Sequence, residues 1–304
     1  MTSKLHEPKS WKGIWTALIT PLDDDGNIDA RSLKALIEDQ ISSGVRGLVI
    51  AGSTGEGSLL SSELYFDLLK KAVDLAQGKI PLVAGLGIGG TELCLENLDK
   101  AKRAGVDGVL ASPPAYIKAP QRALVTHFLR LAEEGLPLCL YEIAGRSASS
   151  INLETIVEIV NSKKAAAKNI VALKDASGNI NRALDQSAAL MDRLALLSGD
   201  DETFTSFLAA GGNGVISVAT HLICNEFVEI QRLFDQGQLA EAQELQAKLN
   251  PFIRGLFWES NPIPVKSLLF KLRRIQSLKF KQPLCPMKED LLEELIRHYE
   301  KIRH

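Results

Sequence analysis

Short runs of consecutive apolar residues recur along the chain from Gly13 onward. Within each run the hydrophobicity is continuous rather than alternating, a pattern typical of strands that are covered on both faces, as in a parallel sheet. Eight such runs are present, at residues 13–20, 47–52, 81–87, 108–113, 137–143, 169–174, 194–199 and 214–219.

Amphipathic stretches separate these runs and predict helices. Several stretches end in a glycine just before the next run, as at Gly44, Gly105 and Gly135, and a glycine there can stop a helix in the left-handed conformation. Repeated strand–helix units in this order predict an α/β fold, a (β/α)8 TIM barrel, whose usual size is about 250 residues. A doubly wound sheet is the alternative, and its strand order would contain a switch point. The predicted helices span residues 32–43, 63–77, 91–104, 121–134, 153–160, 181–191 and 202–210.

The strand-like runs stop at Thr220, and the rest of the chain has helical patterns at 221–236, 239–256, 264–275 and 288–302. Because no low-complexity linker precedes these helices, we expect them to pack on the barrel. We therefore divide the chain into an N-terminal segment (1–12), a (β/α)8 barrel (13–220) and a C-terminal α-helical extension (221–304).

The composition excludes several other classes of protein. Of the 304 residues, 45% are hydrophobic and 24% are charged, which rules out disorder, collagen-like repeats and coiled coil as the main architecture. The 35 Lys and Arg against 37 Asp and Glu give a net charge of −2, whereas a nucleic-acid-binding protein would need a basic excess. We therefore expect no nucleic-acid partner.

Cysteine spacing and the N-terminal residues bear on the location of the protein. The four cysteines, at 94, 139, 224 and 285, form no CxxC pair, which favours free thiols in a reducing compartment over disulfides or a zinc site. No stretch has about 18 uninterrupted apolar residues, and the N-terminus lacks the apolar core of a secretory signal. We expect a cytoplasmic protein with no membrane contact.

Lys174 is the sharpest candidate for chemistry. In a TIM barrel the active site lies at the C-terminal ends of the strands, so the polar residues that close the apolar runs are the ones to inspect. Apolar residues 171–173 lead into Lys174, where a buried strand would place a core residue. A charged amine is costly to bury, and a neutral amine is a nucleophile that can form a Schiff base with a carbonyl substrate. The alternative is a lysine that reaches solvent or pairs with Asp175.

Three further features at strand ends fit the same chemistry. Tyr141 could relay protons beside such a lysine, and the alternative is an ordinary core aromatic. The loop at 52–56, Gly-Ser-Thr-Gly-Glu, offers two hydroxyls and backbone N–H groups that can hold a carboxylate, or it is a tight turn with helix-capping residues. Arg146 could hold a carboxylate by a bidentate fork, or it is simply solvated.

Two other kinds of site are not predicted. Residues 85–90 satisfy the pattern G-x-G-x-x-G, but they belong to the third strand–helix unit, and the next strand ends in Ala-Ser-Pro-Pro rather than in an acidic residue. The five histidines are scattered with no HExxH motif, and the acidic residues at strand ends are few and separated. We expect neither a dinucleotide cofactor nor a metal.

Taken together, these positions resemble the pyruvate-dependent class I aldolase family, which contains dihydrodipicolinate synthase and N-acetylneuraminate lyase. The resemblance extends from residue 16 to residue 266, nearly the whole chain. It is carried by TALITP (16–21), GSTGE (52–56), Tyr141, LKDASG (173–178), LLSGDD (196–201), GGNGVISV (211–218) and NPIPVK (261–266).

The resemblance implies roles for single residues. Lys174 matches the Schiff-base lysine that captures the ketone of pyruvate, and Tyr141 matches the tyrosine that shuttles protons. Ser53 and Thr54 match the pair that binds the pyruvate carboxylate and links to that tyrosine. Backbone carbonyls that line the site near the second substrate and near the lysine are matched by Gly199 and Ile216.

Arg146 favours the synthase members of the family, whose loop after strand 5 carries an arginine that grips the carboxylate of aspartate semialdehyde. The implied reaction condenses pyruvate with L-aspartate 4-semialdehyde to 4-hydroxy-tetrahydrodipicolinate, the entry step of lysine and diaminopimelate biosynthesis. It needs no cofactor beyond the covalent imine on Lys174. The open alternatives are another pyruvate aldolase, such as an N-acetylneuraminate lyase or a 2-keto-3-deoxy sugar acid aldolase, and a catalytically inactive barrel that serves as a binding module.

The chain departs from the synthase pattern at three places. Ser-Thr at 53–54 is the form of the lyase, where synthases have Thr-Thr. Residues 142–144, Glu-Ile-Ala, replace Asn-Val-Pro. The loop after strand 4 reads Ser-Pro-Pro-Ala-Tyr where the family typically has Thr-Pro-Tyr-Tyr, whose second tyrosine reaches the neighbouring subunit's site and completes the proton relay. We expect Tyr116 to be its equivalent, with Ala115 as the competing alignment.

The resemblance also bears on assembly and regulation. The family consists mostly of dimers of dimers, and a catalytic Tyr116 would make sense only across an interface, so we expect a homo-oligomer. In lysine-inhibited members the feedback site lies near the loops after strands 2 and 3, and the groups that would hold lysine look absent here. We therefore expect weak or no inhibition by lysine. The matching positions are Ser58, Ser62, Tyr65, Gly89 and Pro114.

Overall fold

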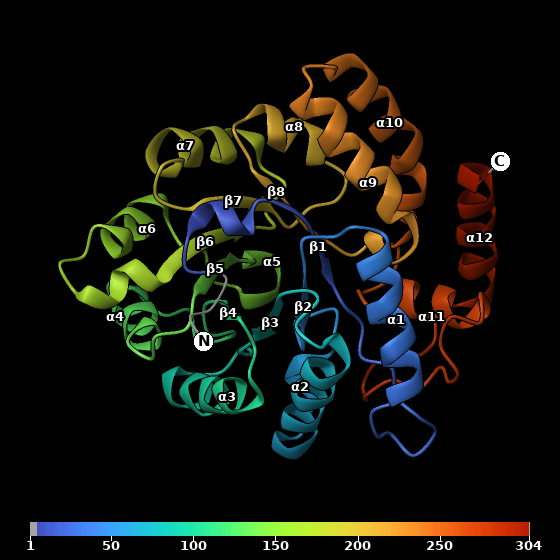
Figure 1. Ribbon diagram of the computed structural model, residues 1–304, viewed down its shortest axis with the longest axis horizontal. Coiled ribbons are helices and arrows are strands. Elements are labelled where there is room, and N and C mark those ends of the chain that lie inside the picture. The colour runs from blue at the N-terminus through green and yellow to red at the C-terminus, as the bar shows by residue number, and fades with distance from the viewer. Residues whose placement is uncertain (1–4, 304) are drawn as a thin grey trace.

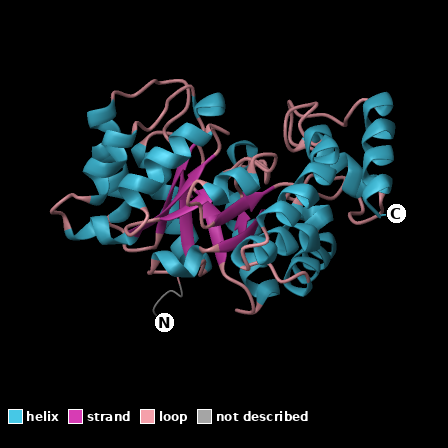
Figure 2. Cartoon of the chain, turned by 90° about the horizontal axis from the view of Figure 1, so that it is seen from above, coloured by secondary structure: helices cyan, strands magenta, loops and turns pink. Residues whose placement is uncertain are grey.

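The strands close into one parallel barrel. The computed structural model describes residues 5–303, and its strands hydrogen-bond in chain order, with β8 returning to β1. Helices surround the strands in Figure 1, and Figure 2 shows the strands at the centre between helices. A closed order has no switch point, so the (β/α)8 prediction is confirmed and the doubly wound alternative is wrong. The strands are β1 (Gly13–Ala17), β2 (Gly47–Ile50), β3 (Leu82–Gly85), β4 (Gly108–Ala111), β5 (Leu138–Glu142), β6 (Ile170–Asp175), β7 (Ala195–Ser198) and β8 (Gly214–Ser217).

The helices of the barrel lie within two residues of their predicted ranges, and several of their ends are capped. The Asp29 side chain caps the first helix by accepting hydrogen bonds from the backbone N–H groups of Arg31 and Ser32, both at 3.0 Å. Gly105 ends the third helix in the left-handed conformation, with φ of 89°. These helices are α1 (Ala30–Ser42), α2 (Ser62–Ala76), α3 (Thr91–Ala104), α4 (Gln121–Ala132), α6 (Leu153–Val160), α7 (Ile180–Leu190), α8 (Phe204–Ala209) and α9 (Thr220–Asp235).

The C-terminal helices contact the barrel through α8 and β1. Helix α9 contacts β1 and lies against α8 and α1, so it occupies the place of the eighth barrel helix, and the barrel continues past the boundary that we expected at residue 220. Helix α10 (Leu239–Gly255) packs on α9 and on α12 (Glu289–Arg303), and α11 (Ile263–Lys271) packs on α12. Helix α11 ends at Lys271, four residues before its predicted end at residue 275. The chain turns just after the helix, where Arg273 takes a positive φ of 57°. Residues 1–4 of the N-terminal segment and residue 304 of the extension lie outside the described residues.

Four short helical segments escaped prediction. They are the helix α5 (Ala144–Ser147) and the 3-10 helices η1 (Pro8–Trp11), η2 (Gly57–Leu59) and η3 (Ala165–Asn169). None is longer than five residues, so none contains enough turns to display an apolar stripe. Helix α5 matters most for the site, because it follows β5 directly and carries Arg146.

Side chains inside the barrel form a core of their own. The N-terminal segment covers this core at the end of the barrel where the strands begin. Trp11 and Trp15 are fully buried and their rings stack with centroids 5.1 Å apart. The Trp11 indole N–H donates to the Leu5 carbonyl at 2.8 Å, which holds the buried Leu5 against the barrel. Because successive strand residues face opposite sides, every second residue of a strand points inward, as Cys139 and Tyr141 of β5 do.

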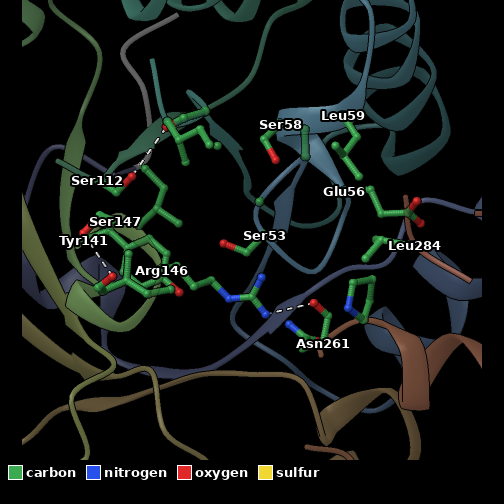
Figure 3. A pocket seen from close by; sticks show the side chains of 18 of the residues that line it. Ser53, Glu56, Ser58, Leu59, Ser112, Tyr141, Arg146, Ser147, Asn261 and Leu284 are labelled. Atoms are coloured by element: carbon green, nitrogen blue, oxygen red, sulfur yellow. Dashed lines mark hydrogen bonds between the residues drawn. The ribbon is translucent and has the colours of Figure 1, made fainter. Parts of the chain in front are cut away.

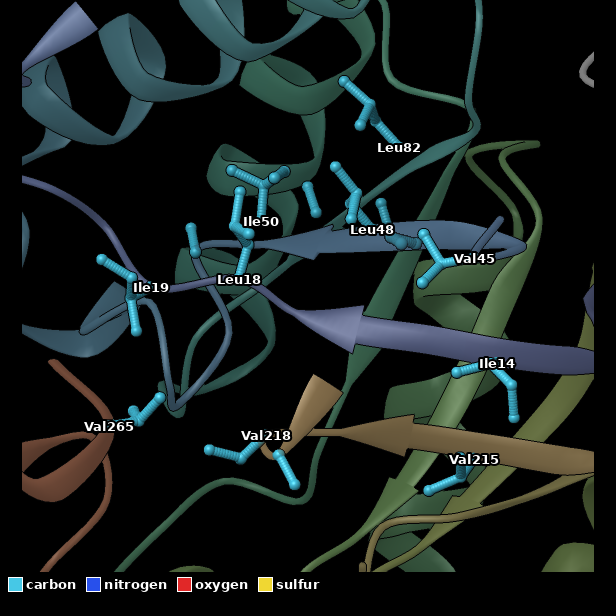
Figure 4. Packing of buried hydrophobic residues seen from close by; sticks show 14 of the residues in the cluster. Ile14, Leu18, Ile19, Val45, Leu48, Ile50, Leu82, Val215, Val218 and Val265 are labelled. Atoms are coloured by element: carbon cyan, nitrogen blue, oxygen red, sulfur yellow. The ribbon is translucent and has the colours of Figure 1, made fainter. Parts of the chain in front are cut away.

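A second, larger core fills the space between the strands and the surrounding helices. Figure 4 shows part of it around β1, β2 and β8, where outward-facing residues such as Ile14, Leu48 and Val215 pack beneath the helices. Burial on both faces explains why the strand sequences are continuously apolar.

The described residues, 5–303, contain neither a membrane-spanning helix nor a disulfide. None of the helices described is both long and apolar enough to cross a lipid bilayer. The four cysteines are free thiols, of which three are buried and Cys285 is exposed.

Candidate active site

A cavity of about 510 Å³ opens at the carboxyl ends of the strands, where the fold places the site of a TIM barrel. Seven of the eight residues proposed from the sequence line it together, although they come from five different strand ends. The exception is Tyr116. The seven are Ser53, Thr54, Tyr141, Arg146, Lys174, Gly199 and Ile216.

Lys174 lies inside the barrel near the end of β6 and is only 6% exposed. Strands β5 and β6 pair so that Lys174 stands beside Tyr141, and its Nζ lies 4.2 Å from the centroid of the tyrosine ring. Among residues 5–303, no carboxylate lies within ion-pair distance of this amine. The amine is therefore held against an aromatic face at the wall of a cavity, without a counter-ion.

Asp175 does not pair with its neighbour Lys174, so that alternative is wrong. Its carboxylate accepts hydrogen bonds from Arg182 Nε at 2.8 Å and from Gln186 Nε2 at 2.5 Å, on the outer side of the strand. The alternation of side chains along β6 sends the two residues to opposite faces. Asp175 thus anchors α7 to the barrel and leaves the amine unpaired.

Gly199 makes room for the lysine. A Cβ atom at this position would come within 2.8 Å of Lys174 Cε and within 2.7 Å of Ala176 Cβ, closer than real Cβ contacts. A larger residue here would displace the lysine side chain, so the glycine is required by close approach rather than by its backbone angles.

A buried ion pair between Glu56 and Lys266 fixes the loop after β2 to helix α11. Glu56 takes a left-handed φ of 56°, and its Oε1 lies 2.5 Å from Lys266 Nζ, with both side chains fully buried. Glu56 Oε2 accepts a hydrogen bond from the backbone N–H of Lys281 at 2.7 Å. Burial lowers the pKa of Lys266, and Glu56 opposes that shift. Residues 53–56 do form a tight turn, closed by the Glu56 N–H on the Ser53 carbonyl at 3.2 Å, but helix α2 is capped by Ser61, so only the capping part of that alternative is wrong.

Thr54 and Arg146 share one neighbour that sequence reasoning left out of the site, Asn261. The Asn261 Nδ2 donates to Thr54 Oγ1 at 2.9 Å, and the Asn261 backbone carbonyl accepts from Arg146 Nη2 at 2.8 Å. Asn261 opens the NPIPVK motif quoted above, so the motif was the available signal. Its side-chain contact, however, arises only when α11 packs beside the loop after β2.

A second cavity of about 360 Å³ adjoins the first, and Ser53, Tyr141, Arg146 and Asn261 line both. In Figure 3 the Arg146 side chain crosses this cavity from α5 toward Asn261. The guanidinium therefore lies between the two cavities, where a carboxylate could meet it.

Glu142, one of the departures from the family pattern, is turned away from both cavities. It is 1% exposed, and its carboxylate accepts hydrogen bonds from the backbone N–H groups of Ile151 at 2.5 Å and Ala144 at 3.2 Å. Burial raises its pKa, and these N–H donors counteract the shift. Its added charge does not reach the substrate cavity; instead it ties down the two ends of the α5 loop that presents Arg146.

The two aspartates after β7 have different surroundings: Asp200 lines a cavity, whereas Asp201 is buried against the backbone. Asp200 lines the larger cavity, and burial raises its pKa. Asp201 is 2% exposed and accepts hydrogen bonds from the N–H groups of Val218 and Ala219, at 3.0 and 2.9 Å. Burial raises the pKa of Asp201 to about 6. Asp201 thus holds the turn from β8 into α9.

Tyr116 does not reach the site within its own chain. It is 94% exposed, takes a φ of 71°, and donates its backbone N–H to the Ser147 carbonyl at 3.2 Å. It lies in the loop after β4, and neither of the two cavities includes it. Its expected catalytic role remains a prediction that requires a second copy of the chain.

The arrangement suits covalent chemistry on a small carbonyl acid. An unpaired buried amine, a phenol, a hydroxyl and a guanidinium line the same cavity. Within residues 5–303, no cluster of three or more His, Cys, Asp or Glu side chains could hold a metal ion.

Comparisons with known proteins agree on one group of relatives. A family model described as the dihydrodipicolinate synthetase family matches residues 10–302. The 4-hydroxy-tetrahydrodipicolinate synthase of Bdellovibrio bacteriovorus is 36% identical over 295 residues, 97% of this chain and 99% of the relative. That of Persephonella marina is 35% identical over 297 residues, covering 96% and 100%.

Solved structures give the same result. The 4-hydroxy-tetrahydrodipicolinate synthase of Methylacidiphilum fumariolicum SolV matches with a TM-score of 0.91 at 33% identity, covering 96% of each chain. A chloride-inhibited dihydrodipicolinate synthase of Acinetobacter baumannii, complexed with pyruvate, matches with a TM-score of 0.90 at 33% identity, covering 96% of this chain and 99% of that one. The similarity therefore covers the barrel and the C-terminal helices alike.

Proposed function

The chain belongs to the dihydrodipicolinate synthetase family, and we propose on that basis that it is a lyase that condenses pyruvate with L-aspartate 4-semialdehyde. The product is 4-hydroxy-tetrahydrodipicolinate, at the first committed step of lysine and diaminopimelate biosynthesis. The observation that carries the proposal is the buried amine of Lys174, which has no counter-ion among the described residues and lies 4.2 Å from the Tyr141 ring centroid in a cavity that also holds Arg146.

The reaction begins with attack of the Lys174 amine on the keto carbon of pyruvate. Tyr141 and Thr54 move the protons that allow water to leave, and an imine forms. Ser53 and Thr54 hold the pyruvate carboxylate through their hydroxyl and backbone N–H groups. The imine withdraws electrons from the adjacent methyl group, which loses a proton to give an enamine, so no metal or cofactor is needed for this step.

The second half of the reaction uses the other end of the cavity. Arg146 holds the carboxylate of the semialdehyde, and the Gly199 carbonyl lies beside the same substrate. The enamine carbon attacks the aldehyde carbon, and the carbon–carbon bond forms. The amino group of the former semialdehyde then attacks the imine carbon, the ring closes, and the bond to Lys174 breaks. The carbonyl of Ile216 lines the lysine side of the cavity during these steps.

The proposal extends to the oligomeric state of the protein and to its location in the cell. We infer a homotetramer arranged as a dimer of dimers, in which the exposed Tyr116 of one subunit enters the site of the next and joins the proton relay. The Ala115 alignment is the competing assignment for that residue. We also infer a cytoplasmic location.

A steady-state assay with pyruvate and a panel of aldehydes tests the proposal. We expect turnover with L-aspartate 4-semialdehyde and little with N-acetylmannosamine or sugar aldehydes. The reverse preference would favour a sugar acid aldolase or a sialic acid lyase, whose Ser-Thr form the chain carries at 53–54. Failure of borohydride to trap pyruvate on the enzyme would favour an inactive barrel that acts as a binding module.

A further inference from the structure

Asn261 comes from outside the barrel and enters the centre of the site. It lies two residues before α11, is 8% exposed, and lines both cavities. Its side-chain amide contacts Thr54 Oγ1 at 2.9 Å, and its backbone carbonyl contacts Arg146 Nη2 at 2.8 Å. One residue therefore meets both the hydroxyl proposed to move protons and the guanidinium proposed to hold the semialdehyde, through two different groups.

A second contact fixes the same pair of segments. Lys266, in the first part of α11, forms the buried ion pair with Glu56, which follows Thr54 by two residues. The segment that carries Asn261 is thus joined to the loop that carries Thr54 by an ion pair as well as by the amide. Two buried contacts therefore fix the Asn261 amide relative to the Thr54 hydroxyl.

The direction of this hydrogen bond matters for chemistry. An amide NH₂ can only donate, whereas a hydroxyl carries one proton to donate and can also accept. With the Asn261 amide on its oxygen, Thr54 acts as the acceptor, and its own proton must point elsewhere. Among the described residues, Thr54 Oγ1 has no other hydrogen-bond partner. The proton is free to point into the cavity that Thr54 lines with Tyr141 and Lys174.

We propose that Asn261 is a positioning residue that sets the direction of proton transfer through Thr54. The inference rests on the proposed function, because it needs Thr54 in the proton relay of imine formation. The side chain and the backbone of Asn261 have separate roles: the amide orients the Thr54 hydroxyl, while the carbonyl, which any residue supplies, holds Arg146.

Asn261→Asp and Asn261→Ala test this separation. The rate of imine formation with pyruvate alone is measured by rapid mixing, borohydride quench and intact mass. At pH 8 the introduced carboxylate can only accept, so it turns the Thr54 hydroxyl toward itself, and we expect a rate about 100-fold lower. As the pH falls and the carboxyl becomes protonated, its O–H can donate as the amide did. The ratio of variant to wild-type rate should therefore rise toward low pH.

Asn261→Ala removes the donor without adding a charge. We expect imine formation about tenfold slower, a ratio to wild type that does not change with pH, and an unchanged KM for the semialdehyde. Thr54→Val and the double variant Thr54→Val/Asn261→Asp should have equal rates, because the amide acts through that hydroxyl.

Asn213→Asp is the matched control. Asn213 precedes β8 at the other end of the barrel, and its Oδ1 accepts a hydrogen bond from the Leu196 backbone N–H at 2.9 Å, an acceptor that aspartate keeps. This variant should have the wild-type rate and pH profile.

The inference is overturned if the Asn261→Asp ratio is flat across pH, or if the Asn261→Ala defect lies in KM for the semialdehyde while imine formation is normal. If Asn261→Asp fails to fold, the Asn261→Ala imine rate alone decides. These outcomes leave the proposed function standing, whereas absence of any pyruvate imine on the wild-type enzyme would remove both.

Discussion

Two buried lysines in this chain have opposite surroundings. Lys266 is fully buried, and its Nζ lies 2.5 Å from Glu56 Oε1. Lys174 is 6% exposed, opens onto the larger cavity, and has no carboxylate within ion-pair distance among residues 5–303; its Nζ lies instead over the Tyr141 ring. Both belong to motifs of the same family, yet the two environments suit different tasks.

The partner of a buried amine decides what that amine can do. A buried ion pair balances the cost of removing two charges from water, so its lysine is committed to that carboxylate and serves the packing of α11 on the loop after β2. An amine without such a partner is not held by a carboxylate and stays within reach of a carbonyl substrate in the cavity. Burial alone would not distinguish the two lysines.

The largest expected effect is the loss of Lys174. Lys174→Met should lower kcat by at least about 10⁴-fold, because no other described amine lies in the larger cavity to form the imine. Lys266→Met is the matched comparison and should still trap pyruvate while folded. Steady-state kinetics and borohydride labelling check both, and a Lys174→Met enzyme with a few per cent of wild-type activity would contradict the assignment.

Breaking the other lysine's pair should act on stability instead. Glu56→Gln leaves Lys266 buried without its counter-ion, and we expect the free energy of unfolding to fall by about 3–5 kcal/mol. In Glu56→Gln/Lys266→Met neither charge remains, so the loss should be smaller than the sum of the two single losses. Denaturant unfolding measures each value; strictly additive losses would mean that the two side chains do not interact.

Arg146→Ala should separate the two halves of the reaction. Because we propose that the guanidinium holds the semialdehyde and not the pyruvate, kcat/KM for the semialdehyde should fall about 100-fold, equivalent to about 2.7 kcal/mol. The rate of imine formation with pyruvate alone should stay near wild type. Arg146→Lys, which keeps the charge but not the fork, should fall between the two. An equal loss in both steps would place Arg146 at the pyruvate end.

Added free lysine should have the smallest effect on the steady-state rate. Of the positions matched to the feedback site, Tyr65 is buried and donates its hydroxyl to the Gly85 carbonyl at 2.9 Å, so that hydroxyl is already engaged. Millimolar lysine should inhibit the steady-state reaction weakly or not at all. Strong partial inhibition in such a titration would refute the expectation.

The barrel could be predicted from the sequence because burial on both faces makes every strand a run of consecutive apolar residues. The continuous apolar runs and the glycine stops placed the strands and helices to within a few residues. Helix α5 could not be found, since four residues show no periodicity. The end of α11 was missed as well, because its boundary depends on a turn at Arg273 and not on a breaker in the helix.

The site was predictable where a polar residue interrupts an apolar run. Lys174 and Tyr141 stand out for that reason, and strand register brings them together. Asn261 does not interrupt an apolar run, because its contact with Thr54 arises from the packing of the C-terminal helices on the barrel. The environment of Glu142 was equally hidden, since the N–H groups that hold it lie in the loop that follows.

The most direct test of the account is to treat the enzyme with pyruvate and borohydride and to map the modified peptide by mass spectrometry. We predict a stable pyruvate-derived adduct on Lys174 and none on Lys266. An adduct on Lys266 or on any other lysine, or no adduct while condensation proceeds, would contradict it.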